Sequence, residues 1–136
     1  MQSFRNLRVW EKAHILTLDV YRSSKSFPRE EAYGLTSQMR RASASIGANI
    51  AEGSCRRGDC DFGRFLQIAI GSASELEYHL LLARDLELLG SADYQRLSEE
   101  VVDVKRMLAS LICKLRADSE KPIALGRNLL PLPHSC

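Results

Sequence analysis

The sequence predicts an all-α protein, an antiparallel up-down-up-down four-helix bundle. Apolar residues recur at spacings of three and four in four separate segments, which is the period of one face of an α-helix. No segment shows the alternation of apolar and polar residues that is typical of a half-buried strand. The segments are joined by short connections containing glycine or proline, and short connections favour antiparallel neighbours.

The first two helices are expected at about residues 9–25 and 35–55. Pro28 ends the first segment, because a proline disfavours helical geometry at the residue before it. The second helix follows Gly34 and has a regular apolar stripe, which consists of Leu35, Met39, Ala42, Ile46 and Ile50.

The third and fourth helices are expected at about residues 61–89 and 92–117. Gly90 separates them, and the fourth helix has the most regular stripe, running from Tyr94 to Leu115 in steps of three and four. After Asp118 the pattern fails and three prolines follow. We therefore assign residues 1–117 to the bundle and residues 118–136 to an extended or disordered tail.

The composition is that of a globular domain, with 45% apolar and 26% charged residues among 136. No apolar run approaches the ~20 residues that a membrane-spanning helix needs, and the start lacks the apolar core of a signal peptide. We expect a cytoplasmic protein with no membrane contact. Its cysteines are expected to be reduced, with a Cys55–Cys60 disulfide across the predicted turn as the alternative.

The sequence contains no recognisable catalytic, cofactor-binding or metal-binding group. Nothing resembles a nucleophile elbow or a phosphate-binding loop. Glu75 and His79 stand four residues apart and occur once, whereas a di-iron bundle needs two Glu-x-x-His motifs. We predict no enzyme activity, no cofactor and no metal.

The third helix carries more leucine than one bundle core requires. A helix that is apolar on several sides is buried on several sides, and a second copy of the chain is the expected cover. The sequence therefore predicts a closed homo-oligomer. The leucines concerned are Leu80, Leu81, Leu82, Leu86, Leu88 and Leu89.

A polar stripe runs along the second helix and is expected to face polar residues of the third. Small neighbouring residues let the two helices approach closely, so these polar groups need partners. We interpret the stripe as a structural hydrogen-bond ladder that sets the helix register, with a ligand or nucleic-acid site as the alternative. The ladder consists of Gln38, Ser45, Asn49, Glu52, Ser72 and Glu75. Its expected cross-helix pairs are Arg41 with Glu75, Ser45 with Ser72 and Gln38 with His79.

Five arginines form the strongest basic cluster of the sequence, in a half of the chain with excess positive charge. Residues 1–64 hold 11 Lys and Arg against 7 Asp and Glu. Guanidinium groups suit phosphate oxygens, so we predict a nucleic-acid-binding surface; a solvated charged face is the alternative. Against this prediction, we expect no aromatic side chains among the arginines to serve as stacking platforms. The cluster consists of Arg40, Arg41, Arg56, Arg57 and Arg64.

Over about residues 4–90 the chain resembles the bacterial four helix bundle family, which includes proteins encoded by intervening sequences in 23S ribosomal RNA genes. The densest match is Gln38, Arg41, Ala42, Ser45, Ile46, Asn49, Ile50, Ala51, Glu52 and Gly53. The resemblance implies a bundle that assembles as a ring, typically a homopentamer. The family is also similar to accessory proteins of diversity-generating retroelements, basic bundles that bind nucleic acid and a reverse transcriptase.

These observations lead to one functional hypothesis and one alternative. The hypothesis is a non-enzymatic, oligomeric scaffold that binds the backbone of RNA or DNA. The alternative is a protein–protein adaptor ring that presents helix faces to a protein partner and binds no nucleic acid.

Overall fold

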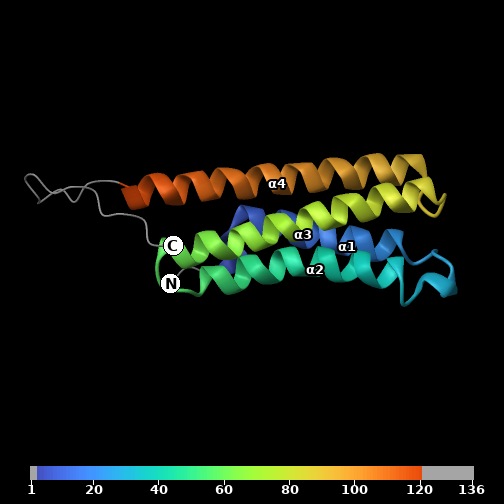
Figure 1. Cartoon of the computed structure of the whole chain (residues 1–136), viewed down its shortest axis with the longest axis horizontal. Coiled ribbons are helices and arrows are strands. Elements are labelled where there is room, and N and C mark those ends of the chain that lie inside the picture. The colour runs from blue at the N-terminus through green and yellow to red at the C-terminus, as the bar shows by residue number, and fades with distance from the viewer. Residues whose placement is uncertain (1–2, 121–136) are drawn as a thin grey trace, which may run out of the picture.

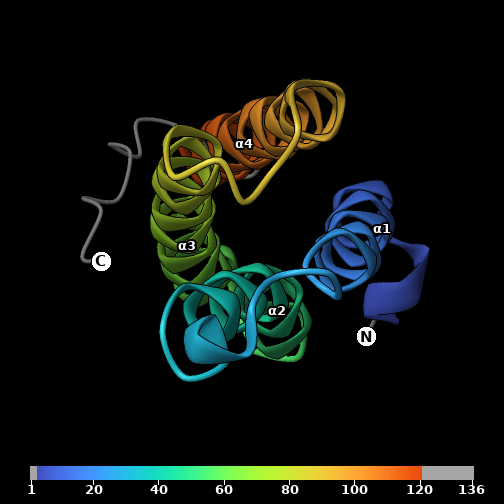
Figure 2. The same ribbon diagram turned by 90° about the vertical axis from the view of Figure 1, so that its right-hand side faces the viewer.

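The computed structural model describes residues 3–120 of the chain. Its α-helices are α1 (Arg8–Ser23), α2 (Leu35–Ser54), α3 (Asp59–Asp85) and α4 (Ser91–Glu120), with 3₁₀ helices η1 (Phe4–Asn6) and η2 (Arg29–Glu31). Both α1 and α3 contact α2 and α4, so the four α-helices form the corners of a square (Figures 1 and 2). The predicted antiparallel four-helix bundle is confirmed.

The core lies along the central axis of this square. All five residues of the predicted α2 stripe are buried, and so are Leu97, Val101 and Leu108 of the predicted α4 stripe. In α3, the steps of three and four from Phe62 to Phe65 and Ala69 predict Phe62 in the core, but Phe62 is only partly buried and Leu66 is the buried residue of the first turns. The 3–4 spacing therefore predicts the buried face well in the middle of each helix and less well at its ends.

The helix ends differ from the predicted ones where local contacts decide them. The Oε2 atom of Glu31 accepts a hydrogen bond from the backbone N–H of Leu35 at 3.2 Å, and α2 begins there. Gly58 has a φ of 92°, a conformation that glycine adopts without strain, and α3 begins directly after it. At its C-terminus α4 includes residues 118–120, so the predicted tail starts three residues too early. The rest of that tail, residues 121–136, lies outside the described residues.

The third helix ends at Asp85, four residues before the predicted end. The N–H of Leu88 bonds the carbonyl of Ala83 at 2.9 Å, and the N–H of Glu87 bonds that of Arg84 at 2.9 Å. These two bonds form a Schellman motif, whose central residue must adopt a left-handed conformation. Glu87 holds that position with a φ of 61°. Glycine usually occupies this place, so the sequence carries no signal for the observed helix end.

Replacing Glu87 by glycine is expected to stabilise the protein by about 1 kcal/mol, because a residue with a Cβ atom is strained in the left-handed conformation. The side chain is exposed and makes no hydrogen bond within residues 3–120, so its removal loses little. Glu87→Ala is the matched control, since it removes the carboxylate and keeps the Cβ atom. Thermal unfolding should show a raised Tm for the glycine variant alone; equal shifts in both variants would contradict the strain.

The outer faces of two helices carry exposed apolar side chains. Ile15 and Leu18 lie on α1, Ile68 and Tyr78 lie on α3, and Leu86 directly follows α3; each is between 38% and 60% exposed. α1 and α3 occupy diagonal corners of the square and do not contact each other. One chain therefore presents two separate apolar surfaces on different sides of the bundle.

Candidate nucleic-acid interface and the polar contacts between helices

The predicted polar ladder is present in its central part, between α2 and α3. The hydroxyl oxygens of Ser45 and Ser72 are 2.9 Å apart and share a hydrogen bond. The Nδ2 atom of Asn49 donates to the Ser45 carbonyl at 2.8 Å and to the Ser45 Oγ at 3.1 Å. All three side chains are half-buried. They connect the two helices at mid-length.

The other members of the predicted ladder lie outside this contact. Gln38 and Glu75 are exposed, and within residues 3–120 no hydrogen bond or ion pair joins Gln38 to His79 or Arg41 to Glu75. Glu52 is exposed and pairs instead with Arg56, which lies just beyond the end of the same helix. These exposed side chains make no bond between the two helices, so the ladder is shorter than predicted.

A second set of polar contacts, which the sequence pattern does not reveal, joins α1 to α2. The hydroxyl of Thr17 donates to the carbonyl of Ser43 at 3.0 Å. The Nε atom of Arg40 donates to Ser24 Oγ at 2.9 Å, and its Nη2 atom donates to the Tyr21 carbonyl at 3.2 Å. A guanidinium at the C-terminal end of α1 compensates the negative end of that helix. Arg40 therefore has a structural role.

The predicted arginine cluster is divided between two places. Arg40 and Arg41 lie near the N-terminal end of α2, and Arg56 lies just beyond its C-terminal end. Sixteen residues separate Arg40 from Arg56, or about 24 Å along a helix. Only Arg56, Arg57 and Arg64 are gathered near the turn between α2 and α3. Of the exposed pair Arg41 and Arg57, neither makes an ion pair within residues 3–120.

Two of the three arginines near the α2–α3 turn lie against an aromatic ring. Arg56 lies over the ring of Phe65 at 5.1 Å and Arg64 at 5.7 Å, measured from the guanidinium carbon to the ring centroid. Each also pairs with a carboxylate, Arg56 with Glu52 at 2.7 Å and Arg64 with Asp61 at 3.3 Å. The expectation that no aromatic side chain accompanies the arginines is wrong for the folded protein, because the α2–α3 hairpin places Phe65 against both Arg56 and Arg64.

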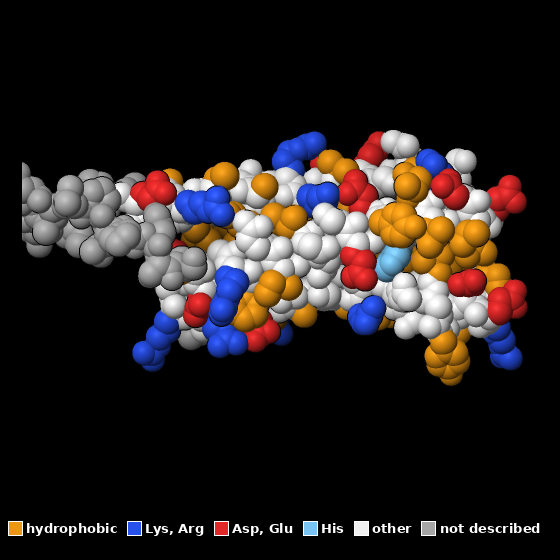
Figure 3. All heavy atoms as spheres, in the orientation of Figure 1, with side chains coloured by type: hydrophobic (Ala, Val, Ile, Leu, Met, Phe, Trp, Pro, Cys, Tyr) orange, Lys and Arg blue, Asp and Glu red, His pale blue; other side chains and the backbone are white. Residues whose placement is uncertain are grey.

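The same end of the bundle also receives the beginning of α1. Because α1 runs antiparallel to α2, its N-terminal end lies beside the C-terminal end of α2, and Arg5 stands in η1 directly before it. Figure 3 shows Lys and Arg side chains gathered at the end where α2 turns into α3, with acidic side chains between them. We call Arg56, Arg57 and Arg64 the arginine turn.

A cluster of charged groups lies between α1 and α4, and the sequence pattern contains no sign of it. The Nε and Nη2 atoms of Arg96 donate to the two carboxylate oxygens of Asp19, each at 2.9 Å. Glu100 adjoins Asp19, and its Oε2 atom is buried without a hydrogen-bond partner in the described part of the chain. The hydrogen bonds from Arg96 lower the pKa of Asp19. Burial, together with the neighbouring Asp19, raises the pKa of Glu100 to about 7.

Residues 3–120 contain no group of three or more His, Cys, Asp or Glu side chains that could hold a metal ion. None of the helices in this range is long and apolar enough to cross a membrane. Cys55 and Cys113 are free and exposed, so the alternative of a Cys55–Cys60 disulfide is wrong. Cys60 is disulfide-bonded, so the expectation that all the cysteines are reduced is wrong as well.

The architecture places this protein among the antiparallel four-helix bundles. The family model of the 23S rRNA-intervening sequence protein matches residues 5–110, and the chain belongs to that family. A crystal structure at 1.70 Å of a protein of unknown function from the S23 ribosomal protein family of Bacteroides thetaiotaomicron VPI-5482 has the same fold. It is 27% identical with a TM-score of 0.72, and the match covers 77% of this chain and 95% of that one. No curated protein matches this chain significantly.

Proposed function

We propose that this protein is a non-enzymatic, homo-oligomeric scaffold that binds the phosphate backbone of RNA or DNA through the arginine turn. The observation that carries the proposal is the convergence of Arg56 and Arg64 on the ring of Phe65, with the exposed Arg57 next to Arg56 in the turn. Guanidinium groups match phosphate oxygens in geometry, and an adjacent ring holds their planes in position. Membership of the 23S rRNA-intervening sequence family supports an association with RNA.

Local charge must drive this binding, because the charge of the bundle as a whole is balanced. The chain has 19 Lys and Arg and 17 Asp and Glu, and Lys121 and Arg127 are the only charged residues beyond position 120. Residues 1–120 therefore carry no net charge. Three arginines per chain account for a modest salt dependence, with a slope of about −3 in a plot of log K against log salt for a duplex. Several copies in one assembly multiply that contribution.

The two exposed apolar surfaces support the homo-oligomeric part of the proposal. The α1 surface with Ile15 and Leu18 differs from the α3 surface with Ile68 and Tyr78, and they lie on diagonal helices. Contact between two different surfaces is heterologous, and repetition of such a contact closes a ring when the rotation allows. A ring of five copies is the size that the family resemblance implies. A mass of one chain in light scattering contradicts the assembly.

Reversal of the charge at two positions, Arg56→Glu with Arg57→Glu, is expected to weaken nucleic-acid binding at least about tenfold at 50 mM salt and to reduce the salt slope. Both side chains are exposed, so folding should not change. The measurement is fluorescence anisotropy with generic single-stranded RNA and duplex DNA over a salt series.

The matched control is Arg84→Glu with Arg106→Glu, which makes the same charge change away from the arginine turn. Both control residues are exposed and each pairs with an aspartate. Equal weakening by the two double variants would show that only net charge matters. Absence of binding by the unmodified protein at low salt would remove the nucleic-acid proposal.

The second candidate is a protein–protein adaptor without nucleic-acid binding. Tyr33 favours it, because this aromatic side chain is 98% exposed at the opposite end of the bundle from the arginine turn. Exposed tyrosines are common anchors at protein interfaces. Nucleic-acid binding by the intact assembly separates the two candidates.

A further inference from the structure

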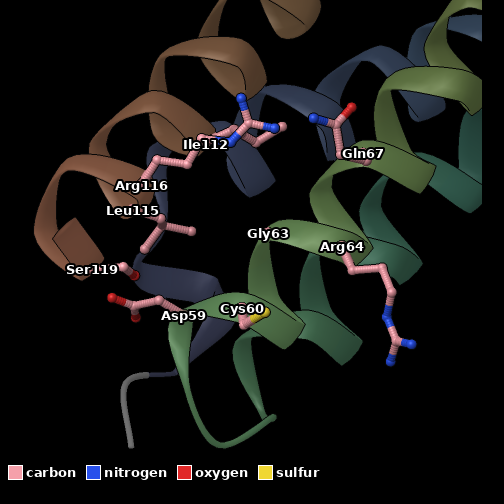
Figure 4. Close-up of a pocket in the computed structure, with 9 residues that line it drawn as sticks. All are labelled: Asp59, Cys60, Gly63, Arg64, Gln67, Ile112, Leu115, Arg116 and Ser119. Carbon is pink, nitrogen blue, oxygen red and sulfur yellow. The ribbon is translucent and has the colours of Figure 1, made fainter. Parts of the chain in front are cut away.

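A groove of about 370 Å³ lies between the first turns of α3 and the last turns of α4. Ile112 and Leu115 supply its apolar wall on α4, and Gly63 stands on the α3 side. A Cβ atom added at Gly63 would meet no atom within 4 Å, so this wall has no side chain opposite Leu115. Figure 4 shows Leu115 projecting toward α3, whereas Arg64 points away from the groove. The groove is open space beside a half-buried leucine.

We propose that the C-terminal segment of the same chain, residues 121–136, binds in this groove. The segment begins directly after Glu120, and Ser119 itself lines the groove, so the attachment point is at the groove's edge. Sixteen residues span up to ~55 Å when extended, whereas Ile112 and Ser119 are only ~10 Å apart along α4. A short tether gives an effective concentration in the millimolar range, which favours the chain's own segment over a separate molecule.

The composition of the segment suits an apolar groove with charged edges. Five of its sixteen residues are leucine or isoleucine, at positions 123, 125, 129, 130 and 132. Its prolines disfavour helix formation and favour an extended chain, the form that fits beside two helices. Its charged residues, Lys121 and Arg127, are both basic, and the groove is lined by Arg64 and Arg116 as well as Asp59, so the apolar side chains and the short tether carry the docking rather than charge.

Docking places the entire net charge of the chain at the end of the bundle that carries the arginine turn. Since residues 1–120 hold equal numbers of acidic and basic residues, the charge of +2 comes from Lys121 and Arg127. The docked segment adds these two cations beside Arg64. The inference itself does not depend on nucleic-acid binding, because docking can be measured on the protein alone.

Limited digestion of the full-length chain with trypsin tests the proposal. Within the segment trypsin cuts only after Arg127, because Lys121 is followed by proline. A segment that is bound most of the time is cut in proportion to its unbound fraction. We expect cleavage after Arg127 to be about tenfold slower in the intact protein than in a synthetic peptide of residues 121–136 under the same conditions. Mass spectrometry of the products gives the rate.

Two variants of the groove should raise the cleavage rate toward that of the peptide. Leu115→Glu puts a charge on the apolar wall, and Gly63→Leu fills the groove from α3 with a side chain that has room there. Leucine also has a higher helix propensity than glycine, so Gly63→Leu should keep the protein folded. It therefore tests the groove even if Leu115→Glu unfolds the bundle. Val102→Glu, at an apolar position of α4 outside the groove, is the control and should leave the rate unchanged.

The proposal is overturned if the intact chain is cut as fast as the peptide, or if both groove variants are cut at the unmodified rate. Protection that increases with protein concentration assigns the groove to the segment of a second copy and overturns docking within one chain. Protection that stays constant over a hundredfold dilution supports it.

Discussion

Replacement of Gly53 by alanine is expected to destabilise the protein by about 2 kcal/mol, since overpacking of a filled contact typically costs ~1–3 kcal/mol. Gly53 is buried in the last turn of α2. A Cβ atom there would lie 2.7 Å from the Cβ atom of Phe65 and 3.0 Å from Cδ1 of Phe62. A Cβ atom is attached rigidly to its helix, so rotation of the Phe65 ring cannot relieve the contact. The two helices must move apart instead.

The same substitution at Gly71 is the matched control. Gly71 lies in the middle of α3, is exposed, and has no atom within 4 Å of an added Cβ. Gly71→Ala should raise stability by about 0.5–1 kcal/mol, because alanine favours the helix. Thermal unfolding should show Tm lowered by about 8 °C for Gly53→Ala and raised for Gly71→Ala. An unchanged or raised Tm for Gly53→Ala would show that the α2–α3 contact is looser than described.

Glu100→Gln is expected to change how the stability of the protein depends on pH. The pKa of Glu100 is about 7 in the folded protein against an ordinary value of 4.5. A group whose pKa is raised by folding stabilises the fold at low pH, and this contribution is lost as the pH rises through the folded pKa. The native protein should therefore lose stability between about pH 5 and pH 8.

The glutamine variant should escape this loss, because its neutral amide replaces the protonated carboxyl next to Asp19 without titrating. Asp19, Arg96 and Lys12 are the charged groups around position 100. The pKa of Asp19 is lowered and that of Arg96 is raised, so neither of these two groups changes protonation in this interval. We expect the variant to be about 1 kcal/mol more stable than the native protein at pH 8 and similar at pH 5, after allowance for solvent screening of a half-exposed carboxyl.

Urea unfolding at a series of pH values measures this difference. Glu99→Gln is the control, since Glu99 is exposed and accepts a hydrogen bond only from Gln95 of its own helix in the described part of the chain. If the curves for Glu100→Gln and Glu99→Gln run parallel to that of the native protein, Glu100 does not titrate as described.

Periodicity predicted the architecture because burial in a bundle repeats with each helical turn. Leu35, Met39 and Ile46 fill the core as their spacing requires. The same reasoning missed the end of α3, because the left-handed residue there is a glutamate and carries none of the usual signal. It also placed Arg40 in a binding surface, although contact with the end of α1, distant in sequence, gives this side chain its partners.

The candidate site shows the same division between local and long-range information. Counting residues outward from the turn between α2 and α3 places Ser45 opposite Ser72, because only a short turn joins these two helices. The arginine turn was predicted as part of a larger cluster, and only the rotation of α3 around its axis decides that Phe65 lies between Arg56 and Arg64. The pairing of Asp19 with Arg96 spans two intervening helices, so no spacing rule applies to it.

The contact between α1 and α4 also sets an order of events in folding. The bond between Asp19 and Arg96 joins residues 77 positions apart, whereas the other three helix contacts join neighbours in the chain. Closing a long loop costs more chain entropy than forming a hairpin, so the three hairpins can form before the square closes. Of the helices in residues 3–120, α4 is also the one synthesised last. Asp19 therefore remains in water until α4 has been made, and α1 completes this bundle only when α4 packs against it.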